Sequence, residues 1–207
     1  MRASCVVTSL LAAAVLFSAP SGAQAAILTF NAGLDGASEN PSNGSPAVGF
    51  ASVVLDTVAH TISVNAQFSG LLSTTTAAHI HCCTDPPTNI GVAVTPVTLP
   101  LFPLGVTSGT YASAALNTLD AATYTAAFVT NFGGGTLEGA EQALIAGLIA
   151  GRAYFNIHTA APLGFPGGEI RGFLQETPIP GALPLFASGL GALGFYGWRR
   201  RRKAHAA

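Results

Sequence analysis

The stretch TISVNAQFS, residues 61–69, alternates strictly between polar and apolar side chains. Successive side chains of a strand point to opposite faces, so this period of two predicts a β-strand that covers a core with one face. The apolar face would carry Ile62, Val64, Ala66 and Phe68. Residues 47–55 are also apolar and β-branched, and the polar residues 56–60 between the two runs predict a hairpin connection.

The rest of the central region repeats this pattern of short apolar runs separated by glycine and proline. We expect further strands at residues 27–35, 77–82, 107–116, 152–159 and 168–175. Residues 136–149 differ, because their apolar side chains recur at helical spacing behind Thr136, a good helix cap. The sequence therefore predicts an all-β fold, an antiparallel Greek-key-like β-sandwich with one short helix, in a single domain at residues 26–176.

The first 25 residues have the three parts of a secretory signal peptide. Arg2 supplies a positive charge, residues 5–19 form an apolar run, and Ala23-Gln24-Ala25 is a small-x-small site. The run is short for a retained membrane anchor. We therefore expect signal peptidase to cut after Ala25 and to release an exported domain.

A second apolar run, residues 179–198, is followed directly by the basic cluster of residues 199–203. Twenty helical residues at about 1.5 Å each span about 30 Å, the thickness of the hydrocarbon of a bilayer. Cations flank such spans on the cytoplasmic side. The pattern predicts a C-terminal transmembrane-like helix that holds the exported domain at a membrane.

The order of features in the tail, residues 177–207, is a proline pair, the apolar span and a run of arginines. These features are carried by Pro178, Pro180, Arg199, Arg200, Arg201 and Arg202. The tail thus resembles a PEP-CTERM sorting signal of the VPLPA variety, although Thr177 and Ile179 replace the usual Val and Leu. The resemblance implies an exosortase-type processing enzyme as a partner and transient anchoring in the inner membrane. Delivery to the cell surface or extracellular matrix of a Gram-negative bacterium that makes exopolysaccharide and biofilm would follow.

Most cations lie in the two terminal segments, so the region between them is strongly acidic. Residues 26–177 keep Arg152 and Arg171 against nine acids, which gives a net charge of 2 − 9 = −7. Such a region repels nucleic acid and anionic lipid surfaces. We therefore exclude a nucleic-acid partner, whereas metal cations and basic partners are compatible with this charge.

Five blocks of the central region form a set: 68–71 (FSGL), 78–83 (AHIHCC), 109–111 (GTY), 151–159 (GRAYFNIHT) and 165–172 (FPGGEIRG). Together they resemble a CHRD domain, which is repeated in the animal protein chordin and occurs singly in bacteria. The resemblance covers residues 27–175. It implies a β fold and an exported location, but no particular reaction, because bacterial members usually have no assigned activity.

Side chains on three predicted strands suit a metal site. His79 and His81 leave one face of a strand, and His158 and Glu169 belong to later strands. If these strands meet, three imidazoles and a carboxylate would suit zinc or copper. The alternative is a structural cluster, in which the histidines bond backbone groups and Glu169 forms a network with Arg171. Both interpretations stay open at this point.

Cys82 and Cys83 are the two cysteines left once the signal segment is removed. Free thiols are unexpected in an oxidising compartment. We favour a vicinal disulfide between them, although adjacent Cα atoms lie only about 3.8 Å apart, closer than most disulfides prefer. Thiolate ligands beside His81 and disulfides to another chain are the alternatives.

The sequence lacks the Gly-x-Ser-x-Gly, Walker and His-Glu-x-x-His motifs of common enzymes. We therefore expect a non-enzymatic exported protein without a cofactor, in a binding or structural role linked to exopolysaccharide or biofilm. Its ligand would be an extracellular polysaccharide or a protein. The competing hypothesis is a periplasmic or secreted enzyme that uses zinc or copper at the histidines, with redox activity included.

Overall fold

The computed structural model describes residues 27–177, 188–191 and 193–195. The longer strands are β1 (Ile27–Asp35), β2 (Val48–Asp56), β3 (Thr61–Ser69), β4 (Thr75–Cys82) and β8 (Ala153–Thr159). The shorter strands are β5 (Val92–Val94), β6 (Gly109–Ala112), β7 (Leu116–Asn117), β9 (Ile170–Phe173) and β10 (Gln175–Glu176). The helices of the domain are a 3-10 turn at Ala121–Thr123, α1 (Ala126–Asn131) and α2 (Leu137–Ile149).

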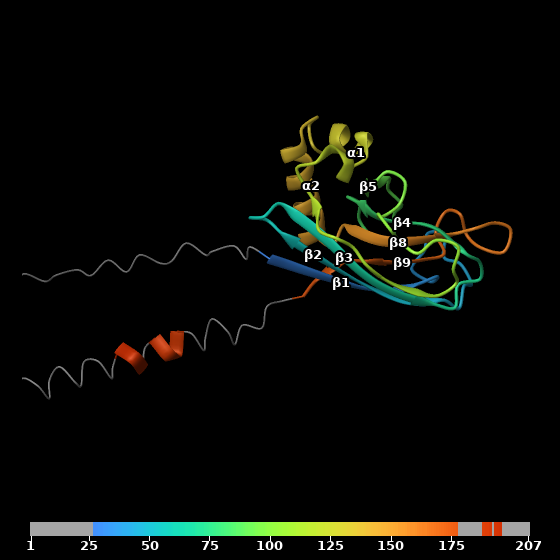
Figure 1. Cartoon of the computed structure of the whole chain (residues 1–207), viewed down its shortest axis with the longest axis horizontal. Helices are drawn as coiled ribbons and strands as arrows, with labels where there is room; N and C mark the ends of the chain where they lie inside the picture. Colours follow the sequence, from blue (N-terminus) through green and yellow to red (C-terminus); the bar gives the residue numbers. More distant parts are fainter. Residues whose placement is uncertain (1–26, 178–187, 192, 196–207) are drawn as a thin grey trace, which may run out of the picture.

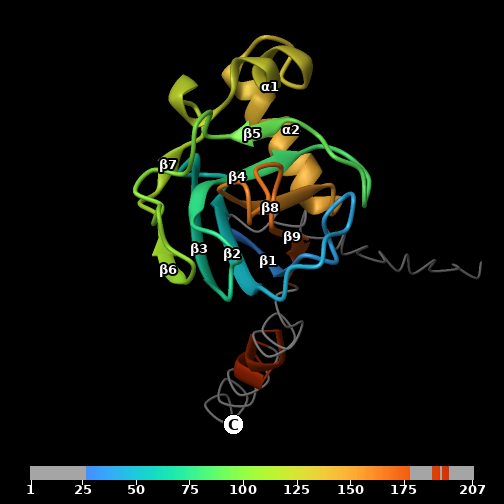
Figure 2. The same cartoon turned by 90° about the vertical axis from the view of Figure 1, so that its right-hand side faces the viewer.

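The strands form one sheet in the order β5-β4-β8-β9-β1-β2-β3-β6, with β10 beside β1 and β7 beside β3. Every strand pairing within the described residues is antiparallel. The sheet curls into a half-barrel (Figures 1 and 2). Strands β1, β2 and β3 follow one another along the chain, and β9 returns from far along the sequence to lie beside β1. The predicted all-β class is confirmed.

The core fills the inside of this curl. The alternation of residues 61–69 is realised in β3, whose apolar face is buried. Neighbouring strands add fully buried side chains such as Phe30, Leu55 and Phe155, and each contributes about 1.5–3 kcal/mol by leaving water. Leu144 and Leu148 of α2 join the same apolar cluster, so the helix closes the core next to β4 and β8.

The helix predicted at residues 136–149 is confirmed as α2. The Thr136 hydroxyl caps it by accepting a hydrogen bond from Gly139 N at 3.1 Å. The helix passes close to the end of β4: a Cβ at Gly147 would overlap the sulfurs of both Cys82 and Cys83. Only glycine therefore allows α2 to approach β4 this closely.

Several details differ from the sequence-based expectation. The domain has two α-helices and a 3-10 turn rather than one helix, because α1 has only six residues, too few for a helical period to show. The strand expected at residues 168–175 is broken into β9 and β10. The strand expected at residues 107–116 is likewise broken into β6 and β7. Next to the break, the Ser113 hydroxyl accepts a hydrogen bond from Val64 N in place of a backbone carbonyl.

The predicted signal segment and most of the predicted tail lie outside the described residues. Among the residues that are described, no helix is both long and apolar enough to cross a bilayer. The cut after Ala25, the span at 179–198 and the sorting residues Pro178, Pro180 and Arg199 to Arg202 stay predictions.

Candidate metal centre

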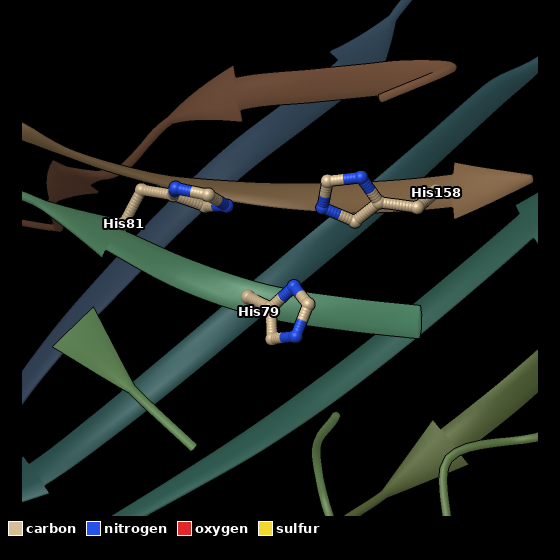
Figure 3. Close-up of side chains that lie close together, drawn as sticks. All are labelled: His79, His81 and His158. Carbon is tan, nitrogen blue, oxygen red and sulfur yellow. The ribbon is translucent and has the colours of Figure 1, made fainter. Parts of the chain in front are cut away.

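Three histidines come together on one face of the sheet (Figure 3). His79 and His81 leave β4, and His158 leaves its neighbour β8, where Asn156 lies opposite His79. The ring centroid of His158 lies 5.1 Å from that of His79 and 6.0 Å from that of His81. One ring nitrogen from each histidine lies within 4.8 Å of the other two. The strands that carry these three histidines therefore lie side by side, as the predicted metal site required.

This histidine face is opposite the hydrophobic core. The intervening residues Ala78 and Ile80 of β4 and Ile157 of β8 point to the other side and are fully buried in the core cluster. The histidines are covered by loops instead, and both His79 and His81 are only 7% exposed. The same two strands thus carry the core on one face and the histidine cluster on the other.

Each imidazole is oriented by a backbone carbonyl. His79 Nε2 lies 2.8 Å from Val97 O, and His81 Nδ1 lies 2.7 Å from Ile90 O. His158 Nδ1 lies 2.9 Å from the oxygen of Pro166. A carbonyl oxygen only accepts, so each of these ring nitrogens carries the proton and donates it.

The opposite nitrogen of each ring is consequently unprotonated in the neutral imidazole. These nitrogens are His79 Nδ1, His81 Nε2 and His158 Nε2, and all three are buried without a hydrogen-bond partner. Unpartnered buried polar atoms are uncommon, and here three acceptors of this kind lie on neighbouring rings. Fixing one ring nitrogen with a carbonyl is also how proteins orient histidines that bind metals.

Burial keeps the rings neutral. It lowers the pKa of His81 from 6.5 to about 4, with the Ile90 carbonyl opposing the shift and neighbouring charges adding to it. Burial is also the main cause that lowers the pKa of His79 and the pKa of His158. At neutral pH the three lone pairs are therefore available, and a metal ion would not have to compete with protons for them.

Three neutral imidazoles suit zinc or copper. Metal–nitrogen bonds of about 2.0–2.1 Å place two ligand nitrogens closer together than 4.8 Å, so the rings would have to move toward one another to bind one ion. Three protein ligands satisfy three positions of a tetrahedral ion and leave the fourth to water or another small ligand. The arrangement can therefore hold an ion and present it to a second molecule.

Glu169 does not belong to this cluster, contrary to the expectation. Its carboxylate is fully buried and accepts hydrogen bonds from Ser45 Oγ, Thr159 Oγ1 and Leu72 N at 2.6–2.7 Å. Glu169 precedes β9 rather than lying within it, so its side chain does not follow the face that the strand pattern assigned. The carboxylate instead ties two loops to the end of β8.

Arg171 was expected to form a network with Glu169, but it pairs with Glu39. The guanidinium of Arg171 is fully buried, and its Nε lies 3.7 Å from Glu39 Oε2. It donates to the oxygen of Pro87 and to Asn89 Oδ1, both at 2.6 Å, and lies 4.8 Å from the centre of the Tyr154 ring. Glu39 is in the loop after β1, and nothing in the sequence pattern pairs that loop with β9.

Tyr154 links this cation to the histidine cluster. Its ring stacks on His81 with centroids 4.7 Å apart and an interplanar angle of 4°. Its hydroxyl donates to Ile90 O at 3.2 Å, the same carbonyl that orients His81. Tyr154 thus fixes both the ring plane of His81 and the loop that holds it.

Cys82 and Cys83 are joined by a disulfide in the structure, with Cα atoms 3.1 Å apart. The Cys82 side chain lies in the hydrophobic core, on the opposite face from His81. Neither sulfur belongs to the group of potential ligands around the histidines. The geometry therefore gives no support to thiolate ligands beside His81.

The three carbonyls that orient the rings were not predicted, since backbone groups leave no compositional signal. Glu39 was not predicted as a site residue either, although an acid in a loop with glycine, serine and asparagine around it was a signal that the sequence offered.

Comparison with known proteins gives one family. The CHRD domain matches residues 30–174, most of the described part of the chain. No curated protein and no solved structure matched significantly.

Proposed function

The chain belongs to the CHRD domain family, a family of extracellular and periplasmic domains, and on this premise we propose that its domain binds zinc or copper through His79, His81 and His158. The observation that carries this proposal is the set of three buried ring nitrogens without hydrogen-bond partners, one on each histidine. A purely structural cluster would satisfy those nitrogens, because leaving a buried polar atom unpaired costs about 1–3 kcal/mol.

The setting proposed for this domain is outside the cytoplasm. The signal-like segment ending at Ala25 would be removed by signal peptidase. The tail at residues 177–207 would anchor the protein in the inner membrane until an exosortase-type enzyme cuts it. The protein would then act at the cell surface or in the extracellular matrix, in a non-enzymatic binding or structural role linked to exopolysaccharide or biofilm.

One observation favours the second candidate, a metal-dependent enzyme. Three protein ligands leave a coordination position that a substrate could occupy, as in catalytic rather than structural zinc sites. Redox activity would require copper in place of zinc, since zinc has no redox chemistry. Activity assays of the zinc-loaded and copper-loaded protein separate this candidate from the binding role.

The experiment that tests metal binding is elemental analysis of the purified mature protein. The protein is treated with a chelator, loaded with Zn²⁺ or Cu²⁺, desalted and measured for metal per chain. We expect about one ion in the unaltered protein and a large loss in His158→Gln, because two imidazoles bind far more weakly than three. The matched control is His60→Gln, which removes a histidine outside the cluster.

Two outcomes would contradict the proposal. The first is less than about a tenth of an ion per chain after loading, which returns the cluster to a structural role. The second is equal metal content in His158→Gln and His60→Gln, which places the ion elsewhere. A melting temperature measured with and without metal completes the test, since an ion that binds only the folded state raises it.

A further inference from the structure

A cavity of about 580 Å³ adjoins the histidine cluster. Its walls come from three loops, residues 39–44, Asn89 and residues 164–168. Pro166 connects this wall to the histidine cluster, because it lines the cavity and its carbonyl orients His158. The volume falls within the range of about 300–1,000 Å³ that small-molecule sites occupy.

Two buried acceptor atoms without partners lie close to Gly168, a residue of the cavity wall. They are Glu39 Oε1 and Asn156 Oδ1, on side chains whose residues are 7% and 2% exposed. A Cβ built on Gly168 would lie 2.8 Å from Glu39 Oε1 and 2.6 Å from Asn156 Oδ1. A side chain at position 168 would therefore collide with both acceptors, so only glycine allows the wall to approach them this closely. Of the two, Glu39 is the one that lines the cavity.

The other polar groups of the wall are mostly engaged. Asn43 Nδ2 donates to Glu169 O at 3.0 Å, and its Oδ1 accepts from Ser45 N at 3.0 Å. Asn89 Nδ2 donates to Asn40 O at 2.6 Å, and its Oδ1 accepts from Arg171. These bonds hold the loops in shape and leave Glu39 Oε1 as the buried acceptor of the wall that lacks a donor.

The unpartnered Glu39 oxygen selects a ligand that donates a hydrogen bond. An anion is disfavoured, because Arg171, the cation that pairs with this wall within the described residues, is fully buried and already engaged with Glu39. An ammonium group is disfavoured as well, because that arginine already compensates the Glu39 carboxylate. Burial acts in the same direction and raises the pKa of Glu39 to about 7, which favours its neutral form. A neutral hydroxyl group suits this position, because it can donate to the Glu39 carboxylate and can also accept from its protonated form.

We propose that this cavity binds a neutral polyhydroxylated ligand, a saccharide unit, of which one hydroxyl donates to Glu39 Oε1. Phe165, Pro41 and Pro166 supply apolar surface in the same wall for the carbon face of such a ring. The inference does not require a metal ion at the histidines. It gives the domain a ligand class that the histidine cluster by itself does not specify.

The test is a nuclear magnetic resonance titration of the mature protein kept free of metal with a chelator. D-glucose, D-galactose, D-mannose and cellobiose are added separately into the millimolar range, and backbone amide shifts are followed. We expect at least one of them to shift the amides of Gly44, Asn89 and Gly168 in a saturable way. Choline serves as the ammonium probe and should leave these amides unchanged.

Ser42→Trp provides the matched variant, because Ser42 lines the cavity, is exposed and can be enlarged without removing a buried partner. Its side chain should obstruct the cavity and weaken saccharide binding by about tenfold or more. Thr110→Trp is the control, an exposed hydroxyl residue on β6 that lines a different cavity. It should bind as the unaltered protein does.

Three results would overturn the inference: no saturable shift with any of the four saccharides, binding of choline in their place, or equal weakening in both tryptophan variants. Since the titration uses metal-free protein, a failure of the metal proposal leaves the saccharide result interpretable, and the reverse also holds.

Discussion

Replacing Glu39 with glutamine should change how the stability of the protein responds to acid. Burial raises the pKa of Glu39 from 4.5 to about 7, with Arg171 opposing part of the shift. Burial lowers the pKa of His81 from 6.5 to about 4. The two groups therefore titrate over the same interval with opposite consequences for folding.

The sign follows from which state binds more protons. Glu39 has a higher pKa in the folded state than in the unfolded state. Its contribution to the free energy of unfolding is therefore fully present below pH 4.5 and is lost as the pH rises through 7. His81 has the lower pKa in the folded state, so its contribution is present above pH 6.5 and is lost as the pH falls through 4. Between pH 6.5 and 4.5 each effect amounts to about 2 kcal/mol, and they offset one another.

Glu39→Gln removes one side of this balance. Acidification from pH 6.5 to 4.5 should then lower the free energy of unfolding by about 2 kcal/mol more in the variant than in the unaltered protein. The measurement is urea unfolding of metal-free protein at several pH values. Glu138→Gln, which removes an exposed carboxylate of α2, measures the effect of net charge alone. Parallel stability curves for the unaltered protein and Glu39→Gln would refute the reasoning.

Three further predictions concern packing and capping. Arg171→Leu should lower the free energy of unfolding by about 3–5 kcal/mol in urea, because it leaves a buried acid without its cation, and adding Glu39→Gln should restore part of the loss. Gly147→Ala should cost about 1–3 kcal/mol by pressing a methyl group against the disulfide sulfurs, whereas Gly33→Ala, where a Cβ meets nothing within 4 Å, should be nearly neutral in a thermal melt. Thr136→Ala should lower stability by about 1 kcal/mol through loss of the α2 cap, and an unchanged urea midpoint would contradict this role.

The strands that were easiest to predict are those with one face buried. β1 and β3 were predicted with their exact ends, because alternation specifies both the strand and its buried face. Strand β5 was missed, since three residues carry no usable period. The curling of the sheet and the neighbour relation of β9 and β1 depend on contacts between distant segments, which one sequence does not reveal.

In the candidate site, too, the residues on alternating strands were predicted and the residues in loops were not. His79, His81 and His158 were found because an alternating strand fixes which side chains share a face. Glu169 was assigned wrongly because it lies outside the strand that was expected to orient it. Glu39 and the orienting carbonyls lie in loops, where the path of the backbone decides each position and the residue type does not predict it.

The placement of core and histidines on opposite faces of β4 and β8 has a consequence for how this scaffold can diversify. Side chains on the histidine face can be exchanged without changing the volume that their apolar neighbours fill on the opposite face, so such a change would not have to be compensated by repacking the core. Substitutions at the histidine positions should therefore leave the packing of the apolar face intact, and a domain of this shape could acquire a different set of polar side chains on the other face.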